Sequence, residues 1–107
     1  MPVTKIESIE QFNSTIQSDK LVLVDFYADW CPPCRRFAPT LEAISNEFAD
    51  VLVVAKLNVD ELREVSNEQR GSERRLPSFI FYKYGKKVDM CTGANETKVR
   101  EMILKHK

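Results

Sequence analysis

The stretch LVLVDFYADWCPPCRRF, Leu21 to Phe37, decides how the rest of the chain is interpreted. It opens with LVLVDFY, a run that is rich in β-branched and aromatic residues and too short for a buried helix. Such a run predicts an interior strand of a sheet covered on both faces. Two cysteines separated by two residues follow, and thiols at that spacing can close into a disulfide and reopen. The stretch therefore predicts a thiol–disulfide oxidoreductase site.

Asp25 is the one charged residue inside the apolar run. An isolated carboxylate in a buried strand is costly to keep ionised, so we expect its pKa to be raised unless a cation or a path to water relieves it. The alternative is an edge strand whose Asp25 side chain faces water.

The cysteines stand at the predicted start of a helix. Pro32 and Pro33 suit the first helical positions, whose N–H groups have no partner within the helix. Apolar residues at helical spacing follow: Phe37, Leu41, Ile44 and Phe48. Cys31 then lies at the positive end of the helix dipole, where a thiolate is favoured, and Cys34 lies about one turn further on, on a more buried side. We expect Cys31 to be the nucleophile and Cys34 the resolving thiol.

Other uses of the cysteines fit less well. A zinc site needs about four ligands, and Cys91 and His106 are the only further candidates in the sequence. A purely structural disulfide between Cys31 and Cys34 would close almost no loop and stabilise little. Cys91 is expected to be a small buried apolar residue, with an intermolecular disulfide or a regulatory thiol as alternatives. His106 lies next to the chain end, where fraying is expected, so it offers no base for a Cys–His site.

The WCPPC motif after a strand that carries an aspartate resembles the thioredoxin family, whose usual motif is WCGPC. The resemblance runs along nearly the whole chain, through VDFYADWCPPC, VVAKLNVD, LPSFIFYKYG and GAN. It implies the thioredoxin fold, an α/β architecture with a single mixed sheet of about five strands flanked by about four helices. Residues 1–107 would form one such domain. CPPC followed by arginine also resembles tryparedoxin and nucleoredoxin, which are longer.

The resemblance implies roles for residues outside the motif. Asp25 would accept the proton of Cys34, and Lys56, on a neighbouring strand, would tune the pKa of that aspartate. The alternative for Lys56 is a surface lysine with a buried stem. Pro77 would follow a cis peptide bond and pack against the cysteines. The backbone of Leu76 would pair with extended substrate.

Three more residues are candidates for substrate contact. Trp30, directly before the motif, offers a flat apolar surface beside Pro33, although tryptophan is more often a core residue. Gly93 permits close backbone approach near the site, or is an ordinary turn glycine.

The sequence departs from the family pattern in two places. Pro32 replaces the usual glycine and removes an N–H group near Cys31, so we expect a changed redox potential without predicting its sign. Ser66–Pro77 is almost entirely polar. Its arginines, Arg70, Arg74 and Arg75, either favour acidic partners beside the substrate platform or belong to a solvated loop.

The remaining pattern alternates strands and helices, which predicts a mixed sheet with helices on both faces. The predicted strands cover residues 3–6, 21–27, 51–59, 78–84 and 87–92, with a hairpin turn at Gly85. Helices are expected after the Ser8–Gln11 capping pattern, from Cys31 toward Asp50 with a bend at Pro39, over Glu61–Glu68, and after Asn95.

Composition limits the partners. Sixteen basic and 16 acidic residues give a formal charge of zero, which argues for neither nucleic acid nor an anionic membrane as a partner. Three cysteines do not make a secreted disulfide framework, and the first twenty residues lack an apolar core of signal-peptide length. We expect a cytoplasmic monomer.

The combined interpretation is a protein dithiol–disulfide oxidoreductase without a bound cofactor. By resemblance, its electrons come from NADPH through a thioredoxin reductase, and its substrates are disulfide-containing proteins, peroxiredoxin-type proteins among them. Two alternatives are kept: a dedicated redox carrier similar to tryparedoxin or nucleoredoxin, and a non-catalytic interaction module.

Overall fold

Two apolar runs of seven residues each form the centre of the sheet. In the computed structural model, which describes residues 3–107, they are the strands β2 (Leu21–Tyr27) and β3 (Leu52–Asn58). They pair in parallel, from Leu21 opposite Leu52 to Tyr27 opposite Asn58. β2 is buried along its whole length except at Tyr27. The predicted interior strand is confirmed.

Three further strands complete a mixed sheet in the order β1-β3-β2-β4-β5. β1 (Thr4–Lys5) lies parallel to β3, β4 (Ser78–Lys83) lies antiparallel to β2, and β5 (Lys86–Thr92) lies antiparallel to β4. Since β2 is flanked by β3 and β4, the edge-strand alternative for Asp25 is wrong.

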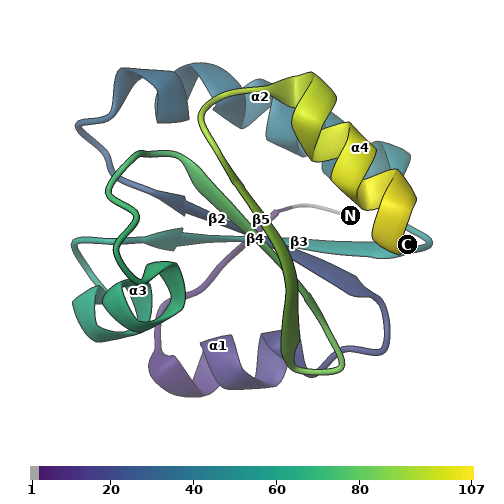
Figure 1. Ribbon diagram of the computed structural model, residues 1–107, viewed down its shortest axis with the longest axis horizontal. Helices are drawn as coiled ribbons and strands as arrows, with labels where there is room; N and C mark the ends of the chain where they lie inside the picture. Colours follow the sequence, from purple (N-terminus) through teal and green to yellow (C-terminus); the bar gives the residue numbers. More distant parts are fainter. Residues whose placement is uncertain (1–2) are drawn as a thin grey trace.

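Four helices cover the two faces of the sheet. Figure 1 shows α2 (Pro32–Glu47) and α4 (Glu96–His106) on one side, and α1 (Ile9–Ile16) and α3 (Arg63–Arg70) on the other. Each side encloses its own apolar cluster, because the side chains of β2 alternate between the two faces. Val22, Val24 and Phe26 belong to the cluster under α1 and α3, and Leu21 and Leu23 to the cluster under α2 and α4.

Side-chain caps begin two of the helices where the sequence predicts them. The Ser8 hydroxyl accepts from the Gln11 N–H at 3.0 Å, and the Asn95 side chain accepts from the Lys98 N–H at 3.0 Å. The Gln11 side chain accepts from the Glu7 N–H at 2.8 Å instead of closing the reciprocal bond to Ser8.

The helix boundaries differ from prediction in two places. α3 begins at Arg63 instead of Glu61, because the Glu61 and Leu62 N–H groups bond back to the Asn58 carbonyl in a turn. It then extends to Arg70, so the first part of the polar segment Ser66–Pro77 is helical. α2 ends at Glu47, before Asp50, and runs through Pro39, where the bend stays a prediction.

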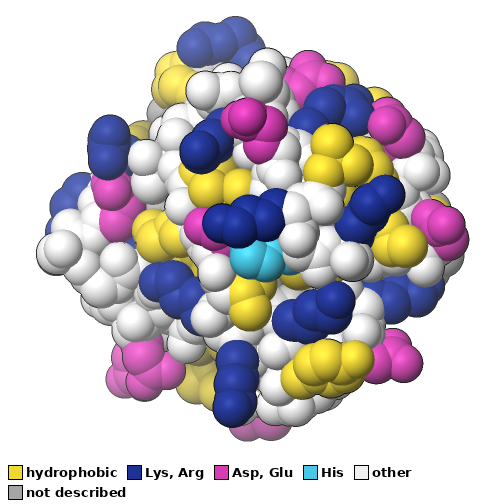
Figure 2. Space-filling view, turned by 45° about the vertical axis from the view of Figure 1, so that its right-hand side comes forward, with side chains coloured by type: hydrophobic (Ala, Val, Ile, Leu, Met, Phe, Trp, Pro, Cys, Tyr) yellow, Lys and Arg dark blue, Asp and Glu magenta, His cyan; other side chains and the backbone are white. Residues whose placement is uncertain are grey.

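None of the helices within residues 3–107 is both long and apolar enough to cross a membrane. Figure 2 shows basic and acidic side chains interspersed on one face of the molecule, with small apolar areas between them.

A hydrogen bond joins β4 to α3, and we expect it to stabilise the fold. The buried Tyr82 hydroxyl donates to Gln69 Oε1 at 2.6 Å. Tyr82→Phe should lower the free energy of unfolding by about 1 kcal/mol, because a buried neutral hydrogen bond contributes about that much. Urea unfolding of both single variants and of Tyr82→Phe with Gln69→Leu should give a coupling energy of about 0.5–1.5 kcal/mol.

Tyr84→Phe is the matched control for this cycle, since Tyr84 is 64% exposed. It should change the free energy of unfolding by less than about 0.5 kcal/mol. Additive effects of the Tyr82 and Gln69 changes would show that the contact contributes nothing of its own.

Candidate active site

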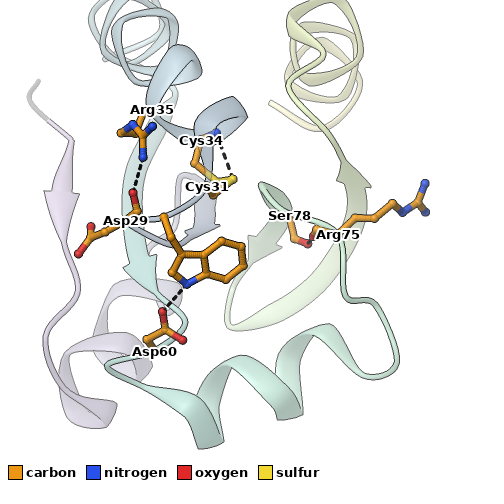
Figure 3. Close-up of a disulfide and its surroundings, with 8 residues drawn as sticks. Asp29, Cys31, Cys34, Arg35, Asp60, Arg75 and Ser78 are labelled. Carbon is orange, nitrogen blue, oxygen red and sulfur yellow. Dashed lines mark hydrogen bonds between the residues drawn. A yellow bond between two sulfur atoms is a disulfide. The ribbon is translucent and has the colours of Figure 1, made fainter.

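The two cysteines meet at the start of α2. Cys31 is the N-cap residue, with extended backbone angles of φ −96° and ψ 105°, and Cys34 lies in the first turn. The two form a disulfide, with their Cα atoms 5.3 Å apart. The Cys34 N–H donates to Cys31 Sγ at 3.3 Å, so the sulfur occupies the place of the oxygen that usually caps a helix. Figure 3 shows the disulfide and this hydrogen bond together.

Because of the two prolines, a single backbone amide, that of Cys34, donates to Cys31 Sγ at the start of the helix. Pro32 and Pro33 occupy the first helical positions and have no N–H group. The Cys34 N–H is therefore the first amide hydrogen of the helix, and it is the one directed at Cys31 Sγ. A negative charge on that sulfur would lie at the positive end of the helix dipole with one direct donor.

The expected difference in burial between the cysteines is wrong for the disulfide form. Cys31 is 3% exposed and Cys34 is 5% exposed. Both belong to the apolar cluster under α1 and α3, and Leu76 packs against that cluster. The N-cap position thus turns the Cys31 side chain inward onto the helix start, so the two thiols differ in their neighbours and not in exposure.

Asp25 lies in the middle of β2, with Lys56 of β3 and Phe79 of β4 as its register partners. It is 4% exposed, and its Oδ1 atom has no hydrogen-bond partner within residues 3–107. Burial raises the pKa of Asp25 to about 7, and the positive charge of Lys56 opposes part of that rise. The predicted elevated pKa is confirmed.

Lys56 fits both interpretations that the sequence left open: it influences Asp25, and it is partly at the surface. Its side chain is partly exposed, and its Nζ atom lies 5.7 Å from the centroid of the Tyr27 ring. It is close enough to Asp25 to act on that carboxyl through its charge.

Cys34 and Asp25 open onto a common hollow beside α2. This hollow has a volume of about 580 Å³, and Lys56 also lines it. Cys31 is not among the lining residues. Cys34 therefore shares a space with a carboxyl group whose pKa burial raises to about 7.

The residues predicted to contact substrate occupy the loop before α2, its first turn, and the segments before β4 and after β5. Trp30 is 66% exposed, which confirms its surface position, and its Nε1 donates to Asp60 Oδ2 at 2.9 Å (Figure 3). The Leu76–Pro77 peptide bond is cis, as expected. The Pro77 carbonyl accepts from the Gly93 N–H at 2.8 Å, which ties the end of β5 to this segment. Pro33 is partly exposed in the first turn of α2.

The structure adds one residue to the site and bears on the two interpretations of another. Asp60 was given no role, although it directly follows an apolar strand run and orients the Trp30 indole. Gly93 has φ +88°, and a Cβ atom there would meet nothing within 4 Å. The backbone conformation therefore favours glycine here, as the turn interpretation holds, and close approach of a substrate backbone stays a prediction.

The arginine side chains of the Ser66–Pro77 segment form hydrogen bonds with other residues of the same segment. The Glu73 carboxylate accepts from the Arg75 backbone N–H at 2.8 Å and from its guanidinium at 3.0 and 3.1 Å, and these bonds lower the pKa of Glu73 to about 2. The Arg75 side chain points away from the disulfide in Figure 3. Arg74 donates to the Gly71 carbonyl at 3.1 Å, and Arg70 Nε donates to Ser66 Oγ at 2.9 Å. A preference for acidic partners stays a prediction.

Cys91 is a free thiol that is only partly buried, and burial raises its pKa to about 11. It packs against the apolar cluster under α2 and α4. Within the described part of the chain, no three histidine, cysteine or acidic side chains come together as metal ligands.

Comparison with known proteins finds this architecture elsewhere. The sequence profile of the Thioredoxin family matches residues 3–105. Thioredoxin-1 of Schizosaccharomyces pombe is 39% identical over 94% of this chain and 95% of its own length. Thioredoxin-T of Drosophila melanogaster is 37% identical over 98% of this chain, which spans 65% of that relative. The solved structure of Fasciola hepatica thioredoxin is 38% identical and has a TM-score of 0.90, with coverage of 98% of this chain and 100% of that one.

The raised pKa of Asp25 predicts a pH-dependent cost of keeping its charge buried. Between the ordinary value of 3.8 and the folded value of about 7, the folded state binds more protons than the unfolded state. The contribution of Asp25 to the free energy of unfolding is therefore largest below about pH 4, and it is lost as the pH rises through 7. The Asp25→Asn variant has no carboxyl group to ionise at this position, so it does not lose this contribution. Between pH 4 and pH 8, its free energy of unfolding relative to that of wild type should increase by about 4 kcal/mol.

Denaturant unfolding of the oxidised proteins at both pH values measures this difference. Asp29→Asn is the control, because Asp29 is exposed and should follow wild type. A difference between Asp25→Asn and wild type that does not change with pH would contradict the raised pKa.

Lys56 should hold the pKa of Asp25 below the value that burial alone would produce. Lys56→Met removes the nearby positive charge, so the pKa of Asp25 should rise above about 7. NMR titration of the Asp25 carboxyl carbon gives this value directly. Lys5→Met, which removes a lysine paired with Glu61 at 3.2 Å, should leave it unchanged. An unchanged value in Lys56→Met would remove Lys56 from the site.

Proposed function

The chain belongs to the thioredoxin family and is a protein dithiol–disulfide oxidoreductase, and we propose that Cys31 is its attacking thiol and Cys34 its resolving thiol. The observation that carries this assignment is the disulfide between the N-cap residue of α2 and the residue one turn later. The helix start favours a thiolate on Cys31, and the Cys34 N–H already points at that sulfur.

In the first step, the Cys31 thiolate attacks one sulfur of a substrate disulfide. A Cys31–substrate disulfide forms, the substrate bond breaks, and the second substrate sulfur leaves as a thiolate that takes a proton from water. The indole of Trp30, 66% exposed, would provide an apolar contact for the bound chain. The backbone of Leu76 before Pro77 would pair with it in extended form, with Pro33 and Gly93 at the margins.

In the second step, the Cys34 thiol gives its proton to the Asp25 carboxylate, through water in the shared hollow. The Cys34 thiolate then attacks Cys31 Sγ, the Cys31–Cys34 disulfide forms, and the first substrate sulfur leaves as a thiolate. Two electrons pass to the substrate. A carboxyl group with a pKa of about 7 suits this task, because it accepts and returns a proton near neutral pH. Lys56 would keep it in that range.

The chemistry requires no bound cofactor, since the cysteine pair itself holds the electrons. We infer that NADPH supplies them through a thioredoxin reductase, and that the substrates are disulfide-containing proteins, including peroxiredoxin-type proteins. We also infer that the chain acts as one domain and as a monomer in the cytoplasm. The cysteine content supports this placement, because three cysteines do not make a secreted disulfide framework. The balanced charge supports neither nucleic acid nor a membrane surface as a partner.

The two alternatives receive less support. The disulfide between Cys31 and Cys34 and the buried Asp25 beside it speak against a non-catalytic interaction module. Identity of 39% over 95% of a thioredoxin favours the general reductase over a dedicated carrier similar to tryparedoxin.

Reduction of insulin separates the two cysteine roles. With NADPH and thioredoxin reductase, wild type should turn over, and both Cys31→Ser and Cys34→Ser should lose turnover. Only Cys34→Ser should trap a mixed disulfide with insulin, because it keeps the attacking thiol and lacks the resolving one. Mass spectrometry under non-reducing conditions detects that product.

Cys91→Ser is the matched control and should keep wild-type turnover, since Cys91 is outside the site. Dithiothreitol in place of the reductase tests the thiol chemistry separately from the partner. A mixed disulfide trapped by Cys31→Ser, with none in Cys34→Ser, would reverse the assignment.

A further inference from the structure

The hollow beside α2 has features of a ligand site that the disulfide exchange does not use. Its walls are mostly apolar and include Val3, Ala38, Pro39 and Leu41. Its volume of about 580 Å³ is within the range of roughly 300–1,000 Å³ typical of small-molecule sites. A water path between Cys34 and Asp25 would need much less space, about 30 Å³ for each molecule.

Among the charged residues that line this hollow, Asp25 is the buried one. Asp25 is 4% exposed and lines the hollow, and its Oδ1 atom has no hydrogen-bond partner among the described residues. A buried carboxylate without a partner is costly, so a ligand that supplied a positive charge or a donor would gain free energy there.

The other charged groups that face the hollow leave room for a cation. Lys56 of β3 is directed over the Tyr27 ring, 5.7 Å from Nζ to the ring centroid, and Arg35 donates to the Asp29 carbonyl at 2.7 Å. The exposed acids Asp29 and Glu42 also line the hollow. Three acids thus face two cations. Lys56 acts on Asp25 through its charge, but Asp25 Oδ1 has no hydrogen-bond partner among the described residues, and Arg35 bonds to a backbone carbonyl.

We propose that this hollow binds a small organic cation with an apolar body, such as a primary arylalkylamine. The ammonium group would bind the Asp25 carboxylate, and the ring would lie against the Ala38 and Leu41 side. The rim acid Glu42 would favour entry of a cation over an anion.

Occupancy would affect the resolving step, and this consequence rests on the proposed function. An ammonium group beside Asp25 holds the carboxylate in its charged form and takes the place of the water through which Cys34 loses its proton. The mixed disulfide on Cys31 would then persist longer. Binding itself does not depend on that role.

The binding test uses the oxidised protein, 15N-labelled, titrated with 2-phenylethylamine at pH 6 and pH 8. Amide shifts should be largest at Ala38, Leu41 and Lys56. With a pKa of about 7, the ionised fraction of Asp25 rises from about 0.1 to about 0.9, so affinity should increase up to about ninefold while the amine stays charged. The neutral isostere 2-phenylethanol should bind more weakly and equally at both pH values.

Three variants locate the site. Asp25→Asn should abolish the pH dependence of amine binding, whereas the matched rim variant Asp29→Asn should keep it. Ala38→Phe, which fills the hollow from an exposed helix position, should prevent binding without touching the carboxyl group. Shifts concentrated at the Trp30 indole and Asp60 would place the amine on the exposed tryptophan and overturn the proposal. Equal affinity of Asp25→Asn and wild type at pH 8 would also overturn it.

A kinetic arm separates this proposal from the proposed function. During insulin reduction at pH 8, saturating 2-phenylethylamine should raise the amount of mixed disulfide in wild type severalfold and leave Ala38→Phe unaffected. Amine that binds in the hollow without raising the mixed disulfide would contradict the role of Asp25 in resolution while supporting the binding site.

Discussion

A carboxyl group held inside the central strand is the constraint on which this structure depends. Asp25 occupies the middle of β2, between β3 and β4, where apolar side chains cover both faces of the sheet. Only residues 28–31 separate the end of β2 from α2, so the first turn of that helix lies over the same end of the sheet. The short connection brings Cys34 to the hollow that Asp25 lines. The free-energy cost of burying the charged form of Asp25 raises its pKa to about 7.

The two cysteines acquire different chemistry from their neighbours. Both are almost fully buried in the disulfide form, so exposure does not distinguish them. Cys31 has an amide N–H directed at its sulfur, which favours negative charge there. Cys34 lines the hollow together with Asp25, the carboxyl group that would accept its proton in the proposed mechanism. Because Pro32 removes a further donor from the helix start, the charge on Cys31 depends on the Cys34 amide more than it would with glycine in that place.

The sequence was informative where local physics determines the outcome. β2 was predicted from a short apolar run, and the Ser8 and Asn95 caps were predicted from side chains that bond within one turn. Prediction failed where contacts between residues distant in the sequence determine the local structure. The turn at Asn58 delays the start of α3, and the bond from Trp30 to Asp60 joins residues thirty positions apart. The near-complete burial of Cys31 involves an apolar cluster assembled from several elements, against which Leu76 also packs, and no spacing in the sequence reveals it.

The arrangement separates the path of electrons from the path of protons. In the proposed mechanism, substrate would meet Trp30 and the Leu76–Pro77 segment, and electrons would pass through Cys31 Sγ. In the proposed mechanism the proton of Cys34 would leave through the hollow, which Cys31 does not line. A bound protein chain can therefore cover the attacking sulfur without closing the route by which the resolving thiol ionises. An amine bound in the hollow, as proposed, would act on the resolving step without competing with the substrate for Trp30 and the Leu76–Pro77 segment.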